Sequence, residues 1–185
     1  MFRVLSTGDE SMSVHKTFGS GTLKTNPALK PNDVILTPEP IAKEMIALYD
    51  IPKGAKVLDP CSGEGVFYNN YPAHCEKDWC EISKGKDFFA YTDSVDWIIS
   101  NPPYSIFEEF LTHSLKIADN VCFLVPLAKV VSSLRRINKV LDYGGFVSMH
   151  IIGASRCGFP FGFPAAAIHM KRGYEGDTEI KMWGE

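Results

Sequence analysis

The sequence predicts an α/β fold with a doubly wound, mostly parallel sheet that carries helices on both faces. Short apolar runs alternate with segments of helical apolar spacing along most of the chain, a pattern typical of parallel strands joined by helices. The composition agrees, because 45% of the 185 residues are hydrophobic and 22% are charged, which is usual for a globular protein. The last two apolar runs, 146–152 and 165–172, predict two final strands, and we expect an antiparallel strand near the C-terminus.

An irregular segment and then a helix are expected at the start of the chain. Residues 1–33 are rich in Ser, Thr, Gly, Asn and Pro and have little periodicity, so we interpret them as a flexible arm before a single domain, 34–185. The helix is expected to begin at Thr37, as its N-cap, with Pro38 in the first position. The apolar face of this helix would consist of Ile41, Met45, Ile46 and Tyr49.

Strands and helices then alternate through the middle of the chain. Apolar runs predict strands at 55–59, 78–82, 95–100 and 120–127. Helical spacing is found at 106–118 and again at 130–145, where two glycines are expected to stop the helix.

Charge, hydropathy and cysteine usage narrow the class of protein. The net charge of −3, from 19 basic and 22 acidic residues, gives no support for a pure DNA-binding module. No stretch approaches the roughly 20 apolar residues that span a bilayer, and the first residues lack a secretory signal. The five cysteines have no framework spacing, so we expect reduced thiols and a cytoplasmic protein, without a metal site.

The residues that follow the strands are the candidates for a site, because ligands of such sheets bind at the carboxyl ends of the strands. The first strand is followed by "DPCSGEG", from Asp59 to Gly65. Glycines permit a tight turn and a close approach of a ligand to backbone amides. The loop lacks the lysine of a phosphate cradle and carries two acids. It therefore favours a neutral or cationic ligand, with a plain strand-to-helix turn as the alternative.

Two further candidates follow the second predicted strand. The carboxylate of Glu81 can accept hydrogen bonds from ribose hydroxyls, although a solvated acid would look the same in the sequence. Asp87 and Phe88 can offer an acceptor and an aromatic face to an adenine ring. The alternative for Phe88 is an ordinary place in the core.

The tetrapeptide Asn101-Pro102-Pro103-Tyr104 follows the strand 95–100. An asparagine oxygen and a carbonyl held rigidly by proline can both accept hydrogen bonds from one planar amine. The Tyr104 ring offers a face on which a planar base can stack. A structural proline turn explains the prolines but not the flanking Asn and Tyr, so this segment predicts catalysis by positioning an amine.

Four segments in this order, "ILTPEPIA", "VLDPCSGEG", "EISKGKDFF" and "SNPPY", together resemble S-adenosylmethionine-dependent amino methyltransferases. The likeness is to the adenine-N6 DNA methyltransferases whose cofactor motifs precede the catalytic motif, and it spans about 33–171. It implies a Rossmann-like sheet and S-adenosylmethionine as cofactor. It also implies direct methyl transfer to the N6 amine of a flipped-out adenine in DNA.

The resemblance also implies roles for individual residues. Thr37 and Pro38 match the segment that closes over the methionine part of the cofactor. Asp59, Pro60, Gly63 and Gly65 match the methionine-binding loop, Glu81 matches the ribose-binding acid, and Asp87 with Phe88 matches the adenine-binding pair. Asn101, Pro102, Pro103 and Tyr104 match the catalytic motif, with Asn101 also at the cofactor. The loop 158–167 matches the second stacking face, for which we choose Phe161 over Phe159 and Phe163.

How the target would be recognised stays open at the level of sequence. Only about thirty residues separate the strand 120–127 from the loop 158–167, which leaves no room for a separate target-recognition domain. Arg135 and Arg136 lie in that span and can contact phosphates, or they can form the solvated face of a helix. The N-terminal arm or a partner chain are further candidates for recognition. The host would be a bacterium or a phage-infected cell.

Two alternatives to DNA adenine methylation are left open. The same tetrapeptide occurs in methyltransferases that act on RNA or on a protein glutamine, since each substrate presents a planar amine or amide. A catalytically degenerate methyltransferase fold that serves as a binding subunit is the second alternative.

Overall fold

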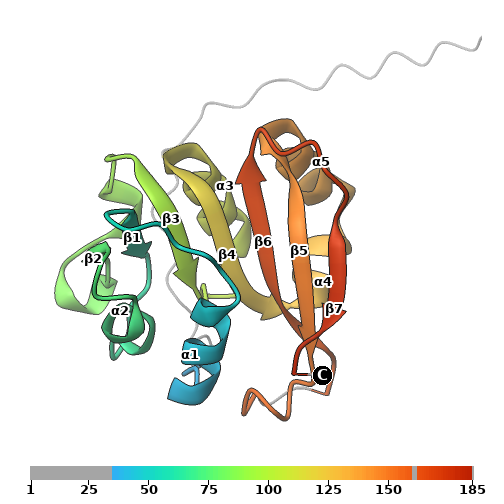
Figure 1. Ribbon diagram of the computed structural model, residues 1–185, viewed down its shortest axis with the longest axis horizontal. Helices are drawn as coiled ribbons and strands as arrows, with labels where there is room; N and C mark the ends of the chain where they lie inside the picture. The colour runs from blue at the N-terminus through green and yellow to red at the C-terminus, as the bar shows by residue number, and fades with distance from the viewer. Residues whose placement is uncertain (1–34, 160–161, 185) are drawn as a thin grey trace, which may run out of the picture.

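The computed structural model describes residues 35–159 and 162–184 and places their strands in one sheet with the order β2-β1-β3-β4-β6-β5-β7 (Figure 1). The strands are β1 Lys56–Asp59, β2 Glu76–Trp79, β3 Val95–Ser100, β4 Ala118–Pro126, β5 Gly144–Ile152, β6 Ala165–Arg172 and β7 Glu179–Met182. The helices are α1 Glu39–Ala47, α2 Val66–Asn70, α3 Phe107–Ile117, α4 Leu127–Val131 and α5 Leu134–Tyr143, with 3-10 turns η1 Ile82–Lys84 and η2 Phe88–Ala90.

The pairing of the strands confirms the predicted fold class. Strands β1 to β4 pair in parallel, and β6 is antiparallel to both of its neighbours, β4 and β5. The edge strand β7 returns parallel to β5. The carboxyl ends of β1 and β3 therefore lie next to each other at one edge of the sheet, where the chain leaves toward the glycine loop and the tetrapeptide.

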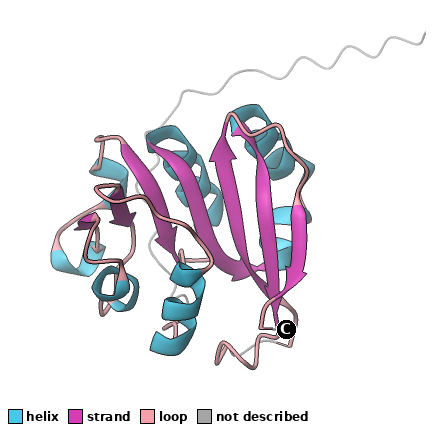
Figure 2. Cartoon of the chain, viewed as in Figure 1, coloured by secondary structure: helices cyan, strands magenta, loops and turns pink. Residues whose placement is uncertain are grey.

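Helices cover both faces of the sheet, as Figure 2 shows. Alternate residues of β4 explain how one strand serves two cores, because successive side chains of a strand point to opposite faces. Val121 and Phe123 are fully buried in the cluster that contains Leu111 of α3. Cys122 and Leu124 are fully buried in the second cluster, which contains α1. A central strand with no exposed face is what the uninterrupted apolar run predicts.

The predicted helix 130–145 is wrong in one respect, its continuity. It is divided into α4 and α5 at Ser132 and Ser133. The Ser132 hydroxyl donates to the Ala128 carbonyl, which illustrates how serine competes with the helix backbone. The predicted glycine stop is confirmed, because α5 ends at Tyr143 with Gly144 as its C-cap, and Gly144 also begins β5. A Cβ on Gly144 would lie 2.3 Å from the backbone nitrogen of Gly173.

Three smaller corrections concern the N-cap of α1, the bounds of β2 and the presence of β7. Helix α1 is preceded by Pro38 as its N-cap, not by Thr37, and the Pro38 carbonyl accepts the first helical hydrogen bonds. Strand β2 occupies Glu76–Trp79, earlier than predicted, so Glu81 lies beyond the strand and caps η1 instead. Strand β7 was not predicted, since its four residues are all exposed and half of them are charged.

The predicted arm 1–33 and Phe161 lie outside the described residues. Within residues 35–159 and 162–184, no helix is long and apolar enough to cross a membrane.

Candidate functional site

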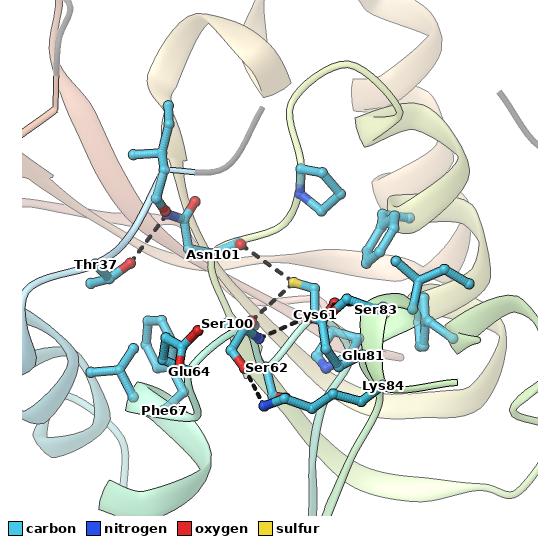
Figure 3. Close-up of a pocket in the computed structure, with 18 of the residues that line it drawn as sticks. Thr37, Cys61, Ser62, Glu64, Phe67, Glu81, Ser83, Lys84, Ser100 and Asn101 are labelled. Carbon is cyan, nitrogen blue, oxygen red and sulfur yellow. Dashed lines mark hydrogen bonds between the residues drawn. The ribbon is translucent and has the colours of Figure 1, made fainter. Parts of the chain in front are cut away.

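A cavity of about 750 Å³ opens at the carboxyl ends of β1 and β3. Predicted site residues that line it are Thr37, Pro60, Gly63, Glu81, Asp87, Phe88, Asn101 and Pro103. Its other lining residues include Cys61, Ser62, Glu64, Ser83, Lys84 and Ser100. Segments far apart in the sequence thus contribute to one site, as the labelled side chains of Figure 3 show.

Asp59 lies beneath the cavity wall and ties three segments together. Its Oδ1 accepts hydrogen bonds from the Ser100 hydroxyl, at 2.7 Å, and from the Cys61 amide, at 3.4 Å. Its Oδ2 accepts from the Tyr68 amide of α2. The carboxylate is completely buried, and this burial raises its pKa to about 7 although the three hydrogen bonds oppose the change. Asp59 is therefore a structural centre of the site and not part of the cavity lining.

Glu81 holds the glycine loop in place. Its Oε2 accepts from the Gly63 amide at 2.8 Å, and its Oε1 accepts from the amide and the hydroxyl of Ser83. Burial raises the pKa of the Glu81 carboxyl, but the hydrogen bonds from Ser83 and Gly63 outweigh it, so the pKa is lowered overall. The Lys84 ammonium donates to the Gly63 carbonyl at 2.6 Å. This carboxylate stays ionised at neutral pH and faces the cavity.

Asp87 and Phe88 line the cavity beside Glu81, and each also has a structural contact. Asp87 Oδ1 accepts from the Phe89 amide and so caps η2. Phe88 is only 3% exposed and packs on Phe110 and His113, with ring centroids 4.9 and 4.7 Å away. Phe88 thus lies at the cavity wall and is also a member of the core cluster, which was the alternative for this residue.

The amide of Asn101 has a fixed orientation. Its Nδ2 donates to the Ile35 carbonyl and to Thr37 Oγ1, both at 3.1 Å, as Figure 3 shows for Thr37. Because the Ile35 carbonyl can only accept, the nitrogen must lie on this side. The oxygen Oδ1 is buried, and within the described residues it has no hydrogen-bond partner. A buried acceptor without a donor is costly, and a ligand or an ordered water that donates to Oδ1 would remove this cost.

The remaining residues of the tetrapeptide are held by their surroundings. Pro103 lines the cavity, whereas Pro102 is buried and Tyr104 packs against the core cluster beneath α3. The Cys61 thiol lies between Ser100 Oγ and the Asn101 carbonyl, 3.3 Å from each (Figure 3). Burial raises the pKa of this thiol well above its usual value, so Cys61 is a neutral hydrogen-bond donor and not a nucleophile.

The basic residues of α5 converge on one acid. Arg135, Arg136 and Lys139 all form ion pairs with Glu108, at 3.2, 2.8 and 2.7 Å. Hydrogen bonding by Lys139 lowers the pKa of Glu108, and Arg136 and the charge of Arg135 act in the same direction. Three cations on one carboxylate leave a positive surplus at this end of α3. Arg135 is the outermost, with its side chain 77% exposed.

Sequence reasoning missed three contributors to the site. Ser100 and Cys61 carry hydrogen bonds at the base of the tetrapeptide, and the only sequence signal for them is their place at strand ends. The Ile35 carbonyl orients Asn101 from 66 residues away, and no local pattern could indicate this contact. Among the described residues, no group of three or more His, Cys, Asp or Glu side chains is placed to hold a metal ion.

Comparisons with known proteins support the architecture. No protein-family model matches the chain, and no curated protein matches its sequence. Solved structures do match. A candidate class I S-adenosylmethionine-dependent methyltransferase from Listeria monocytogenes superposes with a TM-score of 0.61 at 13% identity, over 85% of this chain and 68% of the other.

Two further solved structures show the same likeness. The 23S rRNA methyltransferase ErmE gives a TM-score of 0.58 at 13% identity, over 77% and 73% of the two chains. The modification subunit of a candidate type I restriction enzyme from Vibrio vulnificus YJ016 gives 0.51 at 15% identity, over 80% of this chain and 46% of the other. At such low identity these matches show the fold, which is that of the class I methyltransferases.

Proposed function

We propose that the protein transfers a methyl group from S-adenosylmethionine to the exocyclic N6 amine of adenine in DNA. The observation that carries the proposal is the oriented Asn101 amide, whose buried Oδ1 lacks a donor while its Nδ2 is held by Ile35 and Thr37. A planar amine supplies the missing donor. Holding an amine in place toward an electrophile is catalysis by positioning, which needs no covalent intermediate.

The cavity suits S-adenosylmethionine in charge and in shape. Three carboxylates, from Glu64, Glu81 and Asp87, line it with a single lysine, Lys84. This balance favours a ligand with a positive charge over a polyphosphate. Glu81 would accept from the ribose, with Asp87 and Phe88 at the adenine ring and the 59–65 loop with Thr37 and Pro38 at the methionine part. S-adenosylmethionine would supply an electrophilic methyl group: a carbon–nitrogen bond would form as the carbon–sulfur bond breaks. The thioether S-adenosylhomocysteine would leave with the electron pair, and the methylated nitrogen would release one proton to solvent.

Asn101 and the Pro102 carbonyl would hold the target amine as its nitrogen becomes tetrahedral. Tyr104 and the 158–167 loop, with Phe161, would supply the stacking faces, although Tyr104 is packed against the core here. The Tyr104 ring would then have to turn out of this packing when the base enters. Arg135, whose side chain is 77% exposed although it pairs with Glu108, would contact a phosphate beside the base. Arg136 is less exposed and also donates to the Lys129 carbonyl.

RNA is the second candidate substrate. Solved structures with this fold include ErmE, a 23S rRNA methyltransferase, and a dimethyladenosine transferase from Plasmodium falciparum, with a TM-score of 0.55 at 13% identity. Adenine in RNA presents the same amine to Asn101. We place DNA first because the segment around Thr37 and the phenylalanine-rich loop 158–167 resemble the DNA enzymes, whereas the tetrapeptide occurs in both classes. The neighbour among restriction-enzyme modification subunits agrees with this order and with a partner chain for target recognition.

The test is a transfer assay with labelled S-adenosylmethionine on duplex DNA, RNA and a protein lysate, followed by mass spectrometry of the products. We expect N6-methyladenine in DNA. Asn101→Ala should lose at least a hundredfold in kcat while calorimetry shows that the cofactor still binds. Asn70→Ala is the matched control, because its amide bonds the Val66 carbonyl within α2 and the Glu39 side chain, and Asn70 does not line the cavity. Wild-type turnover in Asn101→Ala would contradict the proposal, and product in RNA alone would favour the second candidate.

A further inference from the structure

Two side chains, one from the loop after β1 and one from helix α4, hold the carbonyls at the two ends of the catalytic tetrapeptide. At its start, the Cys61 thiol donates to the Asn101 carbonyl at 3.3 Å. At its end, the Lys129 ammonium donates to the Tyr104 carbonyl at 3.1 Å. The two prolines between them have no N–H with which to anchor the segment. The position of the Pro102 carbonyl therefore depends on these flanking contacts.

Lys129 is itself fixed by a circuit of hydrogen bonds. It lies on the short helix α4, immediately after β4, and its side chain is partly buried. Arg136 Nη1 donates to the Lys129 carbonyl at 2.6 Å, and Arg136 Nε donates to Glu108 Oε2 at 2.8 Å. Glu108 lies in the first turn of α3, the helix that follows the tetrapeptide. The circuit therefore closes from the tetrapeptide through α3 and α5 back to Lys129.

Ordering the Lys129 side chain costs free energy, which its contacts have to offset. Fixing the long, flexible side chain costs rotamer entropy, and an exposed ammonium prefers water. A charge-assisted hydrogen bond to a carbonyl can offset that cost when the backbone of the donor is held as it is here. The ammonium also places a positive charge beside the loop that would receive an anionic nucleic acid.

We propose that Lys129 is a positioning residue for the catalytic tetrapeptide, and that Glu108 and Arg136 keep it in place. This inference rests on the proposed function for its catalytic meaning. It links the basic residues of α5 to the Tyr104 carbonyl, which follows the proposed amine acceptors on Asn101 and Pro102. Lys129 does not touch the reacting amine and acts through the Tyr104 carbonyl.

The test compares Lys129→Met, Lys129→Arg and the control Lys116→Met. Methionine keeps much of the aliphatic stem but cannot donate, whereas arginine can donate again. Lys116 is an exposed lysine on α3. Amide hydrogen exchange at Tyr104, Ser105 and Ile106 reports on the loop whether or not substrate binds. The kcat for methyl transfer and the cofactor Kd report on the site.

We expect Lys129→Met to exchange about tenfold faster at these amides and to lose about tenfold in kcat, as a lost charge-assisted hydrogen bond would produce. The cofactor Kd should not change, and Lys129→Arg should restore both values. Exchange and kcat equal to those of Lys116→Met would overturn the inference, as would faster exchange with unchanged kcat. If the wild type transfers no methyl group while Lys129→Met still loosens the loop, the proposed function fails and the role of Lys129 in holding the loop is supported.

Discussion

Replacing Asp59 with asparagine should change how stability depends on pH. In the folded protein the pKa of Asp59 is about 7, against 3.8 for an unperturbed aspartate. Between these values the folded state binds more protons than the unfolded state, so the free energy of unfolding falls as pH rises. The stabilisation is fully present below pH 3.8 and is lost by about pH 7. With about 1.4 kcal/mol per pKa unit, the loss amounts to about 4 kcal/mol.

A second buried group opposes this dependence in the wild type. Burial lowers the pKa of His169 from 6.5 to about 4, and its ring bonds the Asn120 side chain. Here the unfolded state binds more protons between pH 4 and 6.5, so stability rises with pH over that range. The two groups have opposite slopes of about 1.4 kcal/mol per pH unit. We therefore expect their contributions to cancel in the wild type between about pH 4.5 and 6.

Asp59→Asn should remove one of the two slopes. Asparagine keeps an Oδ1 that accepts from Ser100 and Cys61. Its side-chain amide group faces the Tyr68 amide, and the free-energy cost of this contact is the same at every pH. Urea unfolding followed by tryptophan fluorescence at several pH values would give the free energies. In the variant they should rise with pH by about 1.4 kcal/mol per unit between pH 4.5 and 6 relative to the wild type. Parallel curves for the two proteins would refute the reasoning, because Asp59 would then titrate alike in both states.

The remaining predictions concern the cavity and its rim. Glu81→Gln keeps one acceptor but removes the charge, so S-adenosylmethionine should bind about tenfold more weakly by calorimetry; an unchanged Kd would exclude the ribose role. Thr37→Val removes one acceptor of the Asn101 amide and should lower kcat about fivefold, as one hydrogen bond of about 1 kcal/mol implies, and an unaltered kcat would show that the Ile35 carbonyl alone suffices. Arg135→Gln should reduce the salt dependence of nucleic-acid binding, the slope of log K against log salt concentration, by about one phosphate contact. Lys53→Gln, far from the cavity, should leave this slope unchanged. Equal slopes for the two variants would show that Arg135 is not part of the interface.

The parallel half of the sheet could be predicted because its signals are local. Strand β3 and the antiparallel strand β6 have the predicted ends, since both are mostly apolar segments. The residues after β1 and β3 were identified as candidates for the same reason. Once the strands are parallel, their carboxyl ends must meet at one edge.

The rest depends on contacts between residues far apart in the chain. The serines at 132–133 divide a segment whose apolar spacing is continuous, and the contact that leaves no room for a Cβ on Gly144 comes from the backbone of Gly173. Glu108 forms ion pairs with basic residues that lie 27 to 31 positions later in the chain. The sequence alone could not distinguish these residues from the solvated face of a helix. The exposed edge strand β7 has too few apolar residues to be distinguished from a loop.

The contact between Asn101 and the segment before α1 bears on the order in which the protein would assemble. Ile35 and Thr37 belong to no strand or helix, and their bonds to Asn101 span 66 and 64 residues. None of the ladders from β1 to β4 needs them, so the sheet can form before these two contacts close. Long-range closures of this kind carry a chain-entropy cost that local packing does not repay. A protein expressed from Pro38 onward would therefore be expected to fold with an Asn101 side chain that is free to rotate. It would have the native fold but would lack the oriented amide on which the proposed methyl transfer depends.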